Sequence, residues 1–267
     1  MRLKDALRET IPADDLKLLN SGYTVIGDIA VIQISEPLQP FRHEIAEAIC
    51  SANHAVRRVI QKRSKLEGEW RVAHLEHLVG EGSLTLHHEF GFTYRLDLAE
   101  VFFNPRLASE RMRVAAEVRS GERVFIPFCG VGPFAVPAAA KGADVVGIEL
   151  NPDACRWFIE NIRLNRVADR VQIIRGDVRR LPLCSEGGFD RAIVPTPYGL
   201  DTCFPYCARM VRNGGTVHFY TFRTPEEIEG LTAHFRSEGY DVRSTRRCGN
   251  VAPGVSRWVF DLVKKPE

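Results

Sequence analysis

A glycine-rich loop between a strand pattern and a helix pattern is the feature that most constrains this sequence. The apolar run 123–128 leads into Cys129-Gly-Val-Gly-Pro-Phe134, and an alanine-rich stretch then extends to about Lys141. Glycine lets the backbone approach a ligand closely, and the N-terminus of the following helix favours electronegative groups. The pattern predicts a nucleotide-binding βα unit, although a tight structural turn would use the same residues.

Carboxylates follow the next two predicted strands. Glu149 ends the apolar run 144–149, and Asp177 follows the run 171–176. At these positions Glu149 can accept both ribose hydroxyls of an adenosine, and Asp177 can accept a hydrogen bond from the adenine amine. A dehydrogenase would share the glycine loop and the first acid, so a nicotinamide cofactor stays open. The second acid and a terminal hairpin favour S-adenosylmethionine.

Strand and helix patterns alternate from about residue 101 onward. Asn151-Pro152 predicts a helix start, because Asn is a good N-cap and proline suits the first helical turn. Further strands are expected at 189–195 and 215–221, and the runs 240–247 and 257–264 predict a final hairpin. Repeated βα units imply an α/β fold with a parallel sheet and helices on both faces.

The first hundred residues predict a different, α+β domain. A hairpin is expected over 23–34 around Gly27-Asp28, followed by a helix over about 42–52. Strand-like stretches follow at 55–61, 83–88 and 91–97. We therefore expect one domain over 1–100, which positions the substrate, and a second over 101–267.

The amino-acid composition limits the cellular compartment, the membrane contact and the metal binding that can be expected of this chain. Seven cysteines, an odd number scattered over 267 residues, indicate reduced thiols rather than a disulfide framework. No apolar run reaches the roughly 18 residues of a membrane span, so we expect a cytoplasmic protein without a membrane contact. Cys203 and Cys207 have no partner cluster, so no metal site is predicted.

Charge is distributed unevenly along a nearly neutral chain. The formal net charge is only +2, yet six basic residues lie between Arg57 and Arg71. Such a local cluster fits contact with a phosphate backbone at one face. A solvated helix face would have the same composition.

Six segments together resemble the archaeal and eukaryotic tRNA (guanine-N1)-methyltransferases that act at position 37. They are Glu67-Gly-Glu-Trp-Arg71, Phe103-Asn-Pro-Arg-Leu-Ala-Ser-Glu-Arg111, Phe128-Cys-Gly-Val-Gly-Pro-Phe134, Ile148-Glu-Leu-Asn-Pro152, Glu160-Asn-Ile-Arg-Leu-Asn165 and Gly176-Asp-Val178. The resemblance covers roughly residues 20–265. It implies a class I S-adenosylmethionine-dependent methyltransferase fold, with a seven-stranded mixed sheet behind the smaller domain. It also implies tRNA as the partner, and we expect a monomer.

The resemblance also implies roles for particular residues. Glu110 is expected to act as the base that removes the N1 proton of guanosine 37, and Arg71 to face O6 of that base. The expected cofactor-binding residues are Arg111, Phe128, Gly130, Gly132, Glu149, Leu150, Asp177, Val178 and Pro195. Besides Arg71, the expected substrate contacts are Arg106 and Pro197. A surface ion pair at a helix start is the alternative for Glu110 and Arg111, and His218 is interpreted as a core histidine.

Three departures from the family pattern keep other functions open. Pro195-Thr-Pro197 stands where the family has Asn-x-Pro, and Ile126 replaces the acid usual in the first strand. The match also begins near the start of the chain, so the extra tRNA-reading domain of the methyltransferases is expected to be absent. The wyosine-pathway aminocarboxypropyltransferases, which move the four-carbon chain of the same cofactor, are similarly short. A dehydrogenase and a catalytically inactive RNA-binding protein also remain alternatives.

Overall fold

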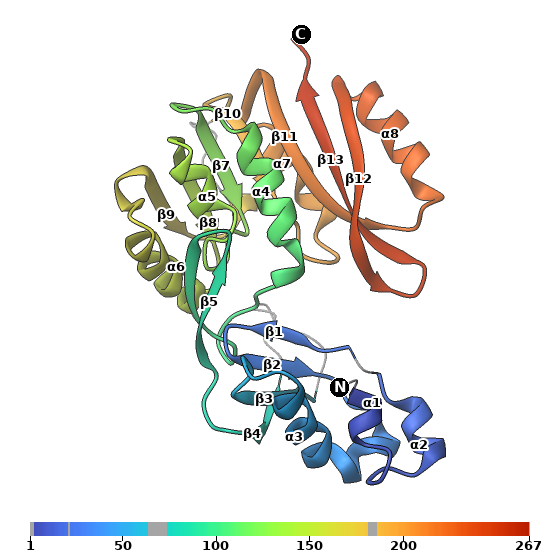
Figure 1. The fold of residues 1–267 in the computed structure, drawn as a ribbon. Coiled ribbons are helices and arrows are strands. Elements are labelled where there is room, and N and C mark those ends of the chain that lie inside the picture. Colours follow the sequence, from blue (N-terminus) through green and yellow to red (C-terminus); the bar gives the residue numbers. More distant parts are fainter. Residues whose placement is uncertain (1–2, 21, 64–73, 181–185, 267) are drawn as a thin grey trace. The chain divides into compact units, whose positions relative to one another are not determined.

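The chain divides into two compact units, Met1–Pro105 and Arg106–Glu267, in a computed structural model that describes residues 3–20, 22–63, 74–180 and 186–266. Figure 1 shows the elements of each unit. The division falls slightly later than the expected boundary after residue 100. The Phe103 ring packs against His87 and Tyr94, with centroids 5.0 and 5.9 Å away, which joins this segment to the first unit.

The first unit contains a four-stranded sheet in the order β1-β2-β3-β4 and a separate hairpin. The strands are β1 (Thr24–Ile26), β2 (Ile29–Ile32), β3 (Arg58–Lys62), β4 (Leu75–Val79) and the hairpin pair β5 (Leu84–Glu89) and β6 (Phe92–Asp97). The predicted turn at 27–28 is confirmed, because Ile26 pairs with Ile29 and Gly27 has φ +59°. Strand β4 was not predicted, since Leu78 is its only buried residue and its sequence has little strand pattern.

Helices cover this small sheet. They are α1 (Leu3–Ala6), α2 (Ala13–Leu18) and α3 (Arg42–Ala52), with a 3₁₀ segment η1 (Glu36–Phe41) between sheet and helix. The bounds of α3 agree with the predicted helix over 42–52. Its Ile45 and Ile49 are fully buried in a core shared with the strand residues Ile32 and Val59.

The second unit is a seven-stranded sheet in the order β12-β13-β11-β10-β7-β8-β9. Its strands are β7 (Arg123–Pro127), β8 (Asp144–Glu149), β9 (Val171–Arg175), β10 (Phe189–Val194), β11 (Val211–Arg223), β12 (Tyr240–Ala252) and β13 (Val255–Lys264). Neighbours from β9 to β11 pair in parallel, whereas β13 is antiparallel to both β11 and β12. The predicted mixed α/β sheet and its terminal hairpin are therefore confirmed.

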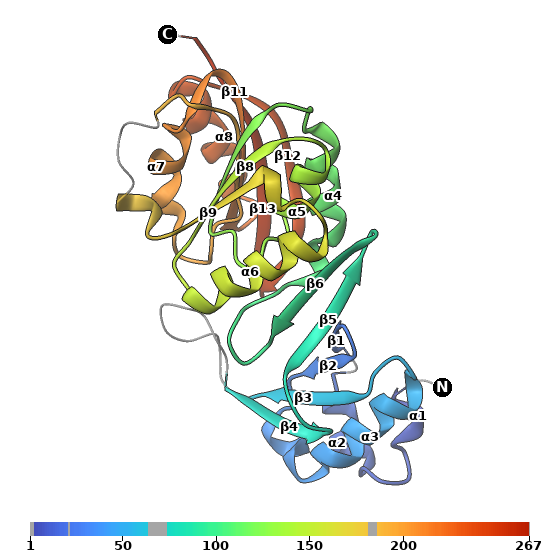
Figure 2. The same cartoon turned by 90° about the vertical axis from the view of Figure 1, so that its left-hand side faces the viewer.

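Five α-helices flank this sheet in the described part of the chain. They are α4 (Ala108–Glu117), α5 (Ala135–Ala140), α6 (Pro152–Leu164), α7 (Phe204–Ala208) and α8 (Glu227–Ser237), and the 3₁₀ turns are η2 (Pro105–Leu107), η3 (Ala168–Arg170), η4 (Val178–Arg180) and η6 (Asp201–Cys203). Figure 2 shows α4 and α5 on one side of the sheet and α7 and α8 on the other. Asn151 caps α6 as predicted, accepting a 2.9 Å hydrogen bond from the backbone of Asp153.

Two observations concern partners other than small molecules. Among the described residues, none of the helices is both long and apolar enough to cross a membrane. The same residues contain no group of three or more His, Cys, Asp or Glu side chains arranged to hold a metal ion. Cys203 and Cys207, considered above as a metal site, are buried free thiols.

Candidate functional site

The two glycines of the loop after β7 have different surroundings. A Cβ added at Gly132 would lie 2.3 Å from the Phe158 ring of α6, at a backbone φ of +89°. At Gly130, with φ +54°, the described residues place no atom within 4 Å of such a Cβ. Gly132 therefore allows α6 to pack closely on the loop, whereas Gly130 leaves open space beside it. Asn161 of α6 reinforces the packing by donating a 3.0 Å hydrogen bond to the Val131 carbonyl.

Glu149, at the end of β8, binds the glycine loop directly. Its Oε2 accepts a 2.8 Å hydrogen bond from the Gly130 amide, and its Oε1 accepts bonds of 2.8 and 2.9 Å from the amides of Leu150 and Asn151. Burial raises the pKa of Glu149, although these hydrogen bonds oppose the shift. Because a carboxylate offers about four lone-pair sites and three of them accept these amides, about one site remains, which suits one ribose hydroxyl rather than the two expected.

Asp177 follows β9 and has a strong partner within its own loop. Its carboxylate accepts hydrogen bonds from the Arg179 side chain, the shortest at 2.6 Å, and one of 2.9 Å from the Arg179 amide. The Arg179 side chain is the main cause that lowers the pKa of Asp177, while burial opposes it. An adenine amine at this carboxylate would have to share it with Arg179. The neighbouring Val178 side chain is part of the hydrophobic core.

The loop after β10 lies at the same edge of the sheet as the glycine loop and the residues that follow β8 and β9. Pro195 and Pro197 are half-buried, and Thr196 between them is buried, with its amide donating a 2.8 Å hydrogen bond to the Val194 carbonyl. Phe128, after β7, packs partly against the hydrophobic core. The carboxyl ends of β7, β8, β9 and β10 thus bring together the loops predicted to bind a nucleotide, as expected for parallel strands.

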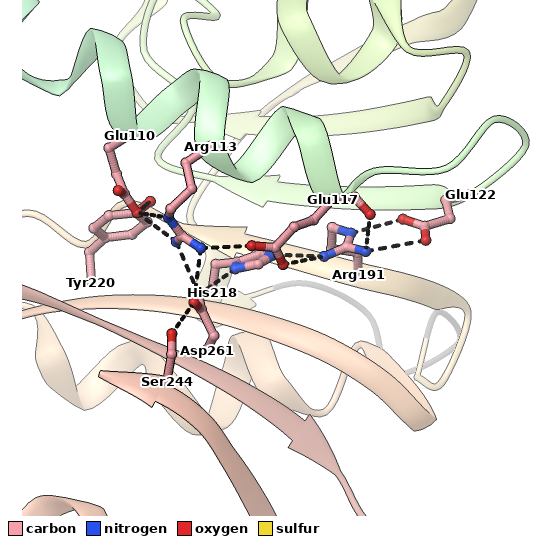
Figure 3. A network of polar contacts seen from close by, with 9 residues as sticks. All are labelled: Glu110, Arg113, Glu117, Glu122, Arg191, His218, Tyr220, Ser244 and Asp261. Carbon is pink, nitrogen blue, oxygen red and sulfur yellow. Dashed lines mark hydrogen bonds and ion pairs between the residues drawn. The ribbon is translucent and has the colours of Figure 1, made fainter. Parts of the chain in front are cut away.

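Glu110 on α4 is buried, only 8% exposed, and held at one oxygen. Its Oε1 accepts a 2.9 Å hydrogen bond from the Tyr220 hydroxyl and bonds of 2.9 and 2.6 Å from Nε and Nη2 of Arg113. Figure 3 shows these side chains converging from α4 and β11. Glu110 is therefore not half of a surface pair. Sequence reasoning missed both partners. The i,i+3 spacing of Glu110 and Arg113 on one helix was a local signal that could have indicated their pair, whereas Tyr220 lies 110 residues away and has no local signal.

Arg113 extends these contacts into a larger network. Its guanidinium also binds Asp261 of β13, with distances of 2.9 and 3.1 Å, and Glu117 at 2.8 Å. Burial alone would lower the pKa of Arg113, but its hydrogen bonds with Glu110 and Asp261 raise it above its ordinary value. Arg113 therefore stays charged and holds three carboxylates together, those of Glu110, Glu117 and Asp261.

The network continues through a histidine inside the sheet. His218 Nδ1 lies 2.6 Å from Asp261 Oδ1, and its Nε2 lies 2.7 Å from Nη1 of Arg191, which also binds Glu122 at 2.8 Å. Because a guanidinium only donates, Nε2 must accept, and Nδ1 carries the proton that is donated to Asp261. His218 is thus a satisfied core histidine, as interpreted from the sequence (Figure 3).

Three predicted arginines differ in their placement. Arg111 on α4 is only 2% exposed, which is unusual for a cation and shows that its side chain points into the protein. Arg106 lies exposed on η2, at the start of the same unit. Arg71 lies outside the described residues.

Several cations of the basic cluster 57–71 have structural partners. Arg58 binds Asp28 at 2.5 Å and the carbonyls of Gly82 and Leu84 at 3.0 and 2.9 Å. Arg63 forms a 3.3 Å ion pair with Glu76, and burial lowers the pKa of Lys62. Arg57 is exposed and forms no ion pair with the described part of the chain. Arg58 therefore has a structural role, and phosphate binding by the cluster stays a prediction.

Family comparisons match both units. A model described as "TRM5/TYW2 methyltransferase domain" matches residues 85–239, and one described as "TYW2 N-terminal domain" matches residues 3–83. The tRNA (guanine(37)-N(1))-methyltransferase Trm5b of Pyrococcus abyssi is 38% identical over 213 residues, which are 79% of this chain and 63% of that protein. This chain thus spans less than two thirds of that relative. In the comparison with the crystal structure of Trm5b from P. abyssi, the matched region covers 98% of this chain and 81% of the Trm5b chain, with a TM-score of 0.87 and 34% sequence identity.

A second relative matches almost from end to end. The tRNA(Phe) (4-demethylwyosine(37)-C(7)) aminocarboxypropyltransferase of Pyrococcus horikoshii is 30% identical over 270 residues, covering 98% of this chain and 95% of that protein. A structure of P. horikoshii TYW2 in complex with MeSAdo has a TM-score of 0.79 at 28% identity and covers 98% of this chain and 97% of its own. The complex of aTrm5 and tRNALeu has a TM-score of 0.89, also at 28% identity, and covers 99% and 78% of the two chains.

Proposed function

Because the chain belongs to the TRM5/TYW2 family, we propose that it is an S-adenosylmethionine-dependent transferase that modifies the base at position 37 of tRNA. The finer proposal is transfer of the methyl group to N1 of guanosine 37. The observation that carries it is the buried Glu110 carboxylate, which Tyr220 and Arg113 hold at a single oxygen. N1 of guanine carries a proton that must leave when N1 attacks a carbon, so the reaction needs a positioned base.

The proposed cofactor site is the sheet edge formed by the glycine loop and the ends of β8 and β9. The open space beside Gly130 and the remaining acceptor capacity of Glu149 fit an adenosine. The other residues assigned here are Arg111, Phe128, Gly132, Leu150, Asp177, Val178 and Pro195. For Val178, whose side chain is in the core, only the backbone is available. Bound there, S-adenosylmethionine would supply an electrophilic carbon on its sulfonium.

In the proposed step, Glu110 would accept the N1 proton of the guanine. N1 could then take the methyl group as the bond from the methyl carbon to the sulfonium sulfur breaks, with S-adenosylhomocysteine leaving as the neutral thioether. The hydrogen bonds on Oε1 orient the carboxylate, and within the described residues no hydrogen bond occupies Oε2, which we assign as the proton acceptor. Arg113 keeps its charge throughout, so it continues to hold Glu110 after the proton has moved. By family resemblance, Arg71 faces O6 and stabilises the developing negative charge, and Arg106 and Pro197 contact the substrate.

Aminocarboxypropyl transfer is a second candidate, favoured by one specific observation. The family model for the first unit is that of TYW2, and the aminocarboxypropyltransferase of P. horikoshii aligns with nearly the whole chain. The P. abyssi Trm5b structure also covers 98% of this chain, so both branches contain a unit like residues 1–105. Methyl transfer is preferred because identity is 38% with Trm5b against 30% with the other relative.

A double-label experiment tests both proposals. The protein is incubated with undermodified tRNA and S-adenosylmethionine that carries label either in the methyl group or in the carboxyl carbon. Methyl label in the RNA supports guanosine methylation, and carboxyl label overturns it in favour of aminocarboxypropyl transfer. If neither label enters the RNA although tRNA and S-adenosylhomocysteine both bind, the chain is an inactive RNA-binding protein. Calorimetric binding of NAD(H) without S-adenosylhomocysteine would instead support a dehydrogenase.

A further inference from the structure

An exposed aromatic side chain lies next to the proposed substrate proline. Tyr198, the residue after Pro197, is 56% exposed, although its ring packs edge-on against Phe222 at a centroid distance of 5.1 Å. The guanidinium of Arg257 lies over the same Phe222 ring, 4.9 Å from its centroid. A tyrosine that only filled the core would be buried, so the packing leaves much of this ring facing solvent.

This aromatic and cationic group lies close to Glu110. Phe222 and Tyr220 are two residues apart in the regular part of β11, so both side chains point to the same face of the sheet. Residues spaced in this way are about 7 Å apart along a strand. The Tyr220 hydroxyl in turn contacts Glu110 at 2.9 Å. Phe222 is therefore the next side chain on the same face of β11 after the tyrosine that holds Glu110.

Cys248 of β12 provides an independent sign of this proximity. Burial raises its pKa to about 12, Glu110 adds to the shift, and Arg113, Arg257 and Arg246 oppose it. The Cys248 thiol is thus close enough to be affected both by the Glu110–Arg113 pair and by Arg257. Arg246 and Arg257 therefore contribute positive charge near the Cys248 thiol.

We propose that Tyr198, Phe222 and Arg257 form a subsite for the unpaired nucleotide adjacent to the base that reacts at Glu110, an inference that rests on the proposed function. The exposed Tyr198 ring stacks on the base, and Arg257 faces the backbone phosphate. Single-stranded nucleotides are bound by this combination because every base has an aromatic face and every linkage a negative charge. The subsite would keep the loop unstacked around position 37 while the target base enters the site.

The test uses a fluorescent anticodon stem-loop RNA with guanosine 37, titrated with the full chain in the presence of S-adenosylhomocysteine. Tyr198→Ala should weaken binding by about 5- to 150-fold, the range expected for loss of one stacked base. Tyr198→Phe keeps the ring and should recover most of the affinity. Tyr206→Ala is the matched control, because Tyr206 is also exposed and has an arginine, Arg209, 5.4 Å from its ring, but on α7.

Modified RNA then shows whether the ring contacts a base. The titrations are repeated with stem-loops that lack the base at position 36 or at position 38. One of these RNAs should bind wild type and Tyr198→Ala equally, because the contact is already missing. Arg257→Gln should weaken all RNAs alike and lower the salt dependence of binding by about one charge.

The outcomes separate this proposal from the proposed function. Wild-type affinity of Tyr198→Ala, or an equal loss on every RNA, overturns the subsite while leaving the transferase intact. A change in oligomeric state without an effect on RNA binding would also overturn it and assign the surface to a second copy of the chain. If wild type itself neither binds the stem-loop nor labels it, the proposed function fails and the subsite with it. Unchanged affinity for S-adenosylhomocysteine verifies that each variant is folded.

Discussion

The Tyr220 hydroxyl donates a 2.9 Å hydrogen bond to Oε1 of Glu110, across 110 residues of sequence. The same oxygen receives Arg113, so a buried carboxylate is fixed by a neutral donor and a cation at once. This arrangement fits the proposed role of Glu110 as a base, and variants of Glu110 and of its partners can test that role.

Changing Glu110 and Tyr220 separately should give different kinetic losses. Glu110→Gln should lower the single-turnover rate by about 10²- to 10⁴-fold, the usual contribution of a general base, with unchanged affinity for S-adenosylmethionine. Tyr220→Phe removes one donor and should cost about tenfold. Tyr240→Phe, another buried tyrosine, is the control. Wild-type rates in Glu110→Gln across the pH range would refute the assignment.

Replacing Arg113 should separate positioning from simple stability. Arg113→Lys keeps a positive charge but loses the fork that spans Glu110 and Asp261, so we expect a lower single-turnover rate. Arg191→Lys perturbs the far end of the same network, where Arg191 contacts His218 and Glu122. Urea unfolding should show that both variants lose stability. If both also lose the same fraction of activity, Arg113 has only a structural role.

Replacing each of the two loop glycines with alanine should give different phenotypes. Gly132→Ala places a methyl group 2.3 Å from the Phe158 ring at positive φ, so unfolding free energy should fall by about 3 kcal/mol or more. Gly130→Ala meets no described atom, so only the backbone strain of about 1–2 kcal/mol is expected. Its new methyl group instead enters the open space assigned to the cofactor, and calorimetry should show weaker S-adenosylhomocysteine binding. Equal stability of the two variants would contradict this difference.

Asp261 should make the protein acid-sensitive. Burial alone would raise the pKa of Asp261, but hydrogen bonds from His218, Ser244 and Arg113 hold it well below its ordinary value of 3.8. A carboxyl with a depressed folded pKa stabilises the protein above its unfolded value, and this stabilisation is lost as pH falls below about 3.8. Asp261→Asn should therefore be less stable at pH 7 and show a flatter stability curve between pH 5 and 2, measured by urea unfolding. Asp144→Asn, which removes a largely exposed carboxylate, is the surface control for the loss of one negative charge.

Alanine variants of two neighbouring arginines in the first unit should have separate effects, one on stability and the other on RNA binding. Arg58→Ala removes the contacts to Asp28, Gly82 and Leu84, so it should destabilise the protein by about 1–3 kcal/mol. Arg57→Ala changes an exposed cation and should instead reduce the salt dependence of tRNA binding by about one charge. Thermal unfolding and tRNA titrations at several salt concentrations measure the two effects. A reduced salt dependence in a fully stable Arg58→Ala would reverse the assignment.

Local sequence order determined the architecture of the proposed cofactor site. The glycine loop, the Asn151 cap and the acids after β8 and β9 could be read directly, because successive parallel strands bring their carboxyl ends to one edge of a sheet. The hairpin at 24–32 and helix α3 were equally predictable, since a turn residue at positive φ and helical spacing are local signals. The role of Arg58 was not, because its partners lie 24 to 30 residues away.

Only the tertiary structure decided which side chains surround Glu110. Arg113 meets Asp261 across 148 residues, and Tyr220 meets Glu110 because α4 packs against the face of the sheet that carries both β11 and β13. No periodicity or spacing in the sequence encodes such pairs, since they depend on strand order and on the residue that each strand presents at one level of the sheet. The sequence therefore determined where the proposed nucleotide site lies. The fold determined that one buried carboxylate is held by Arg113 and Tyr220, since the pairing of buried charges depends on which side chains packing brings within hydrogen-bonding distance.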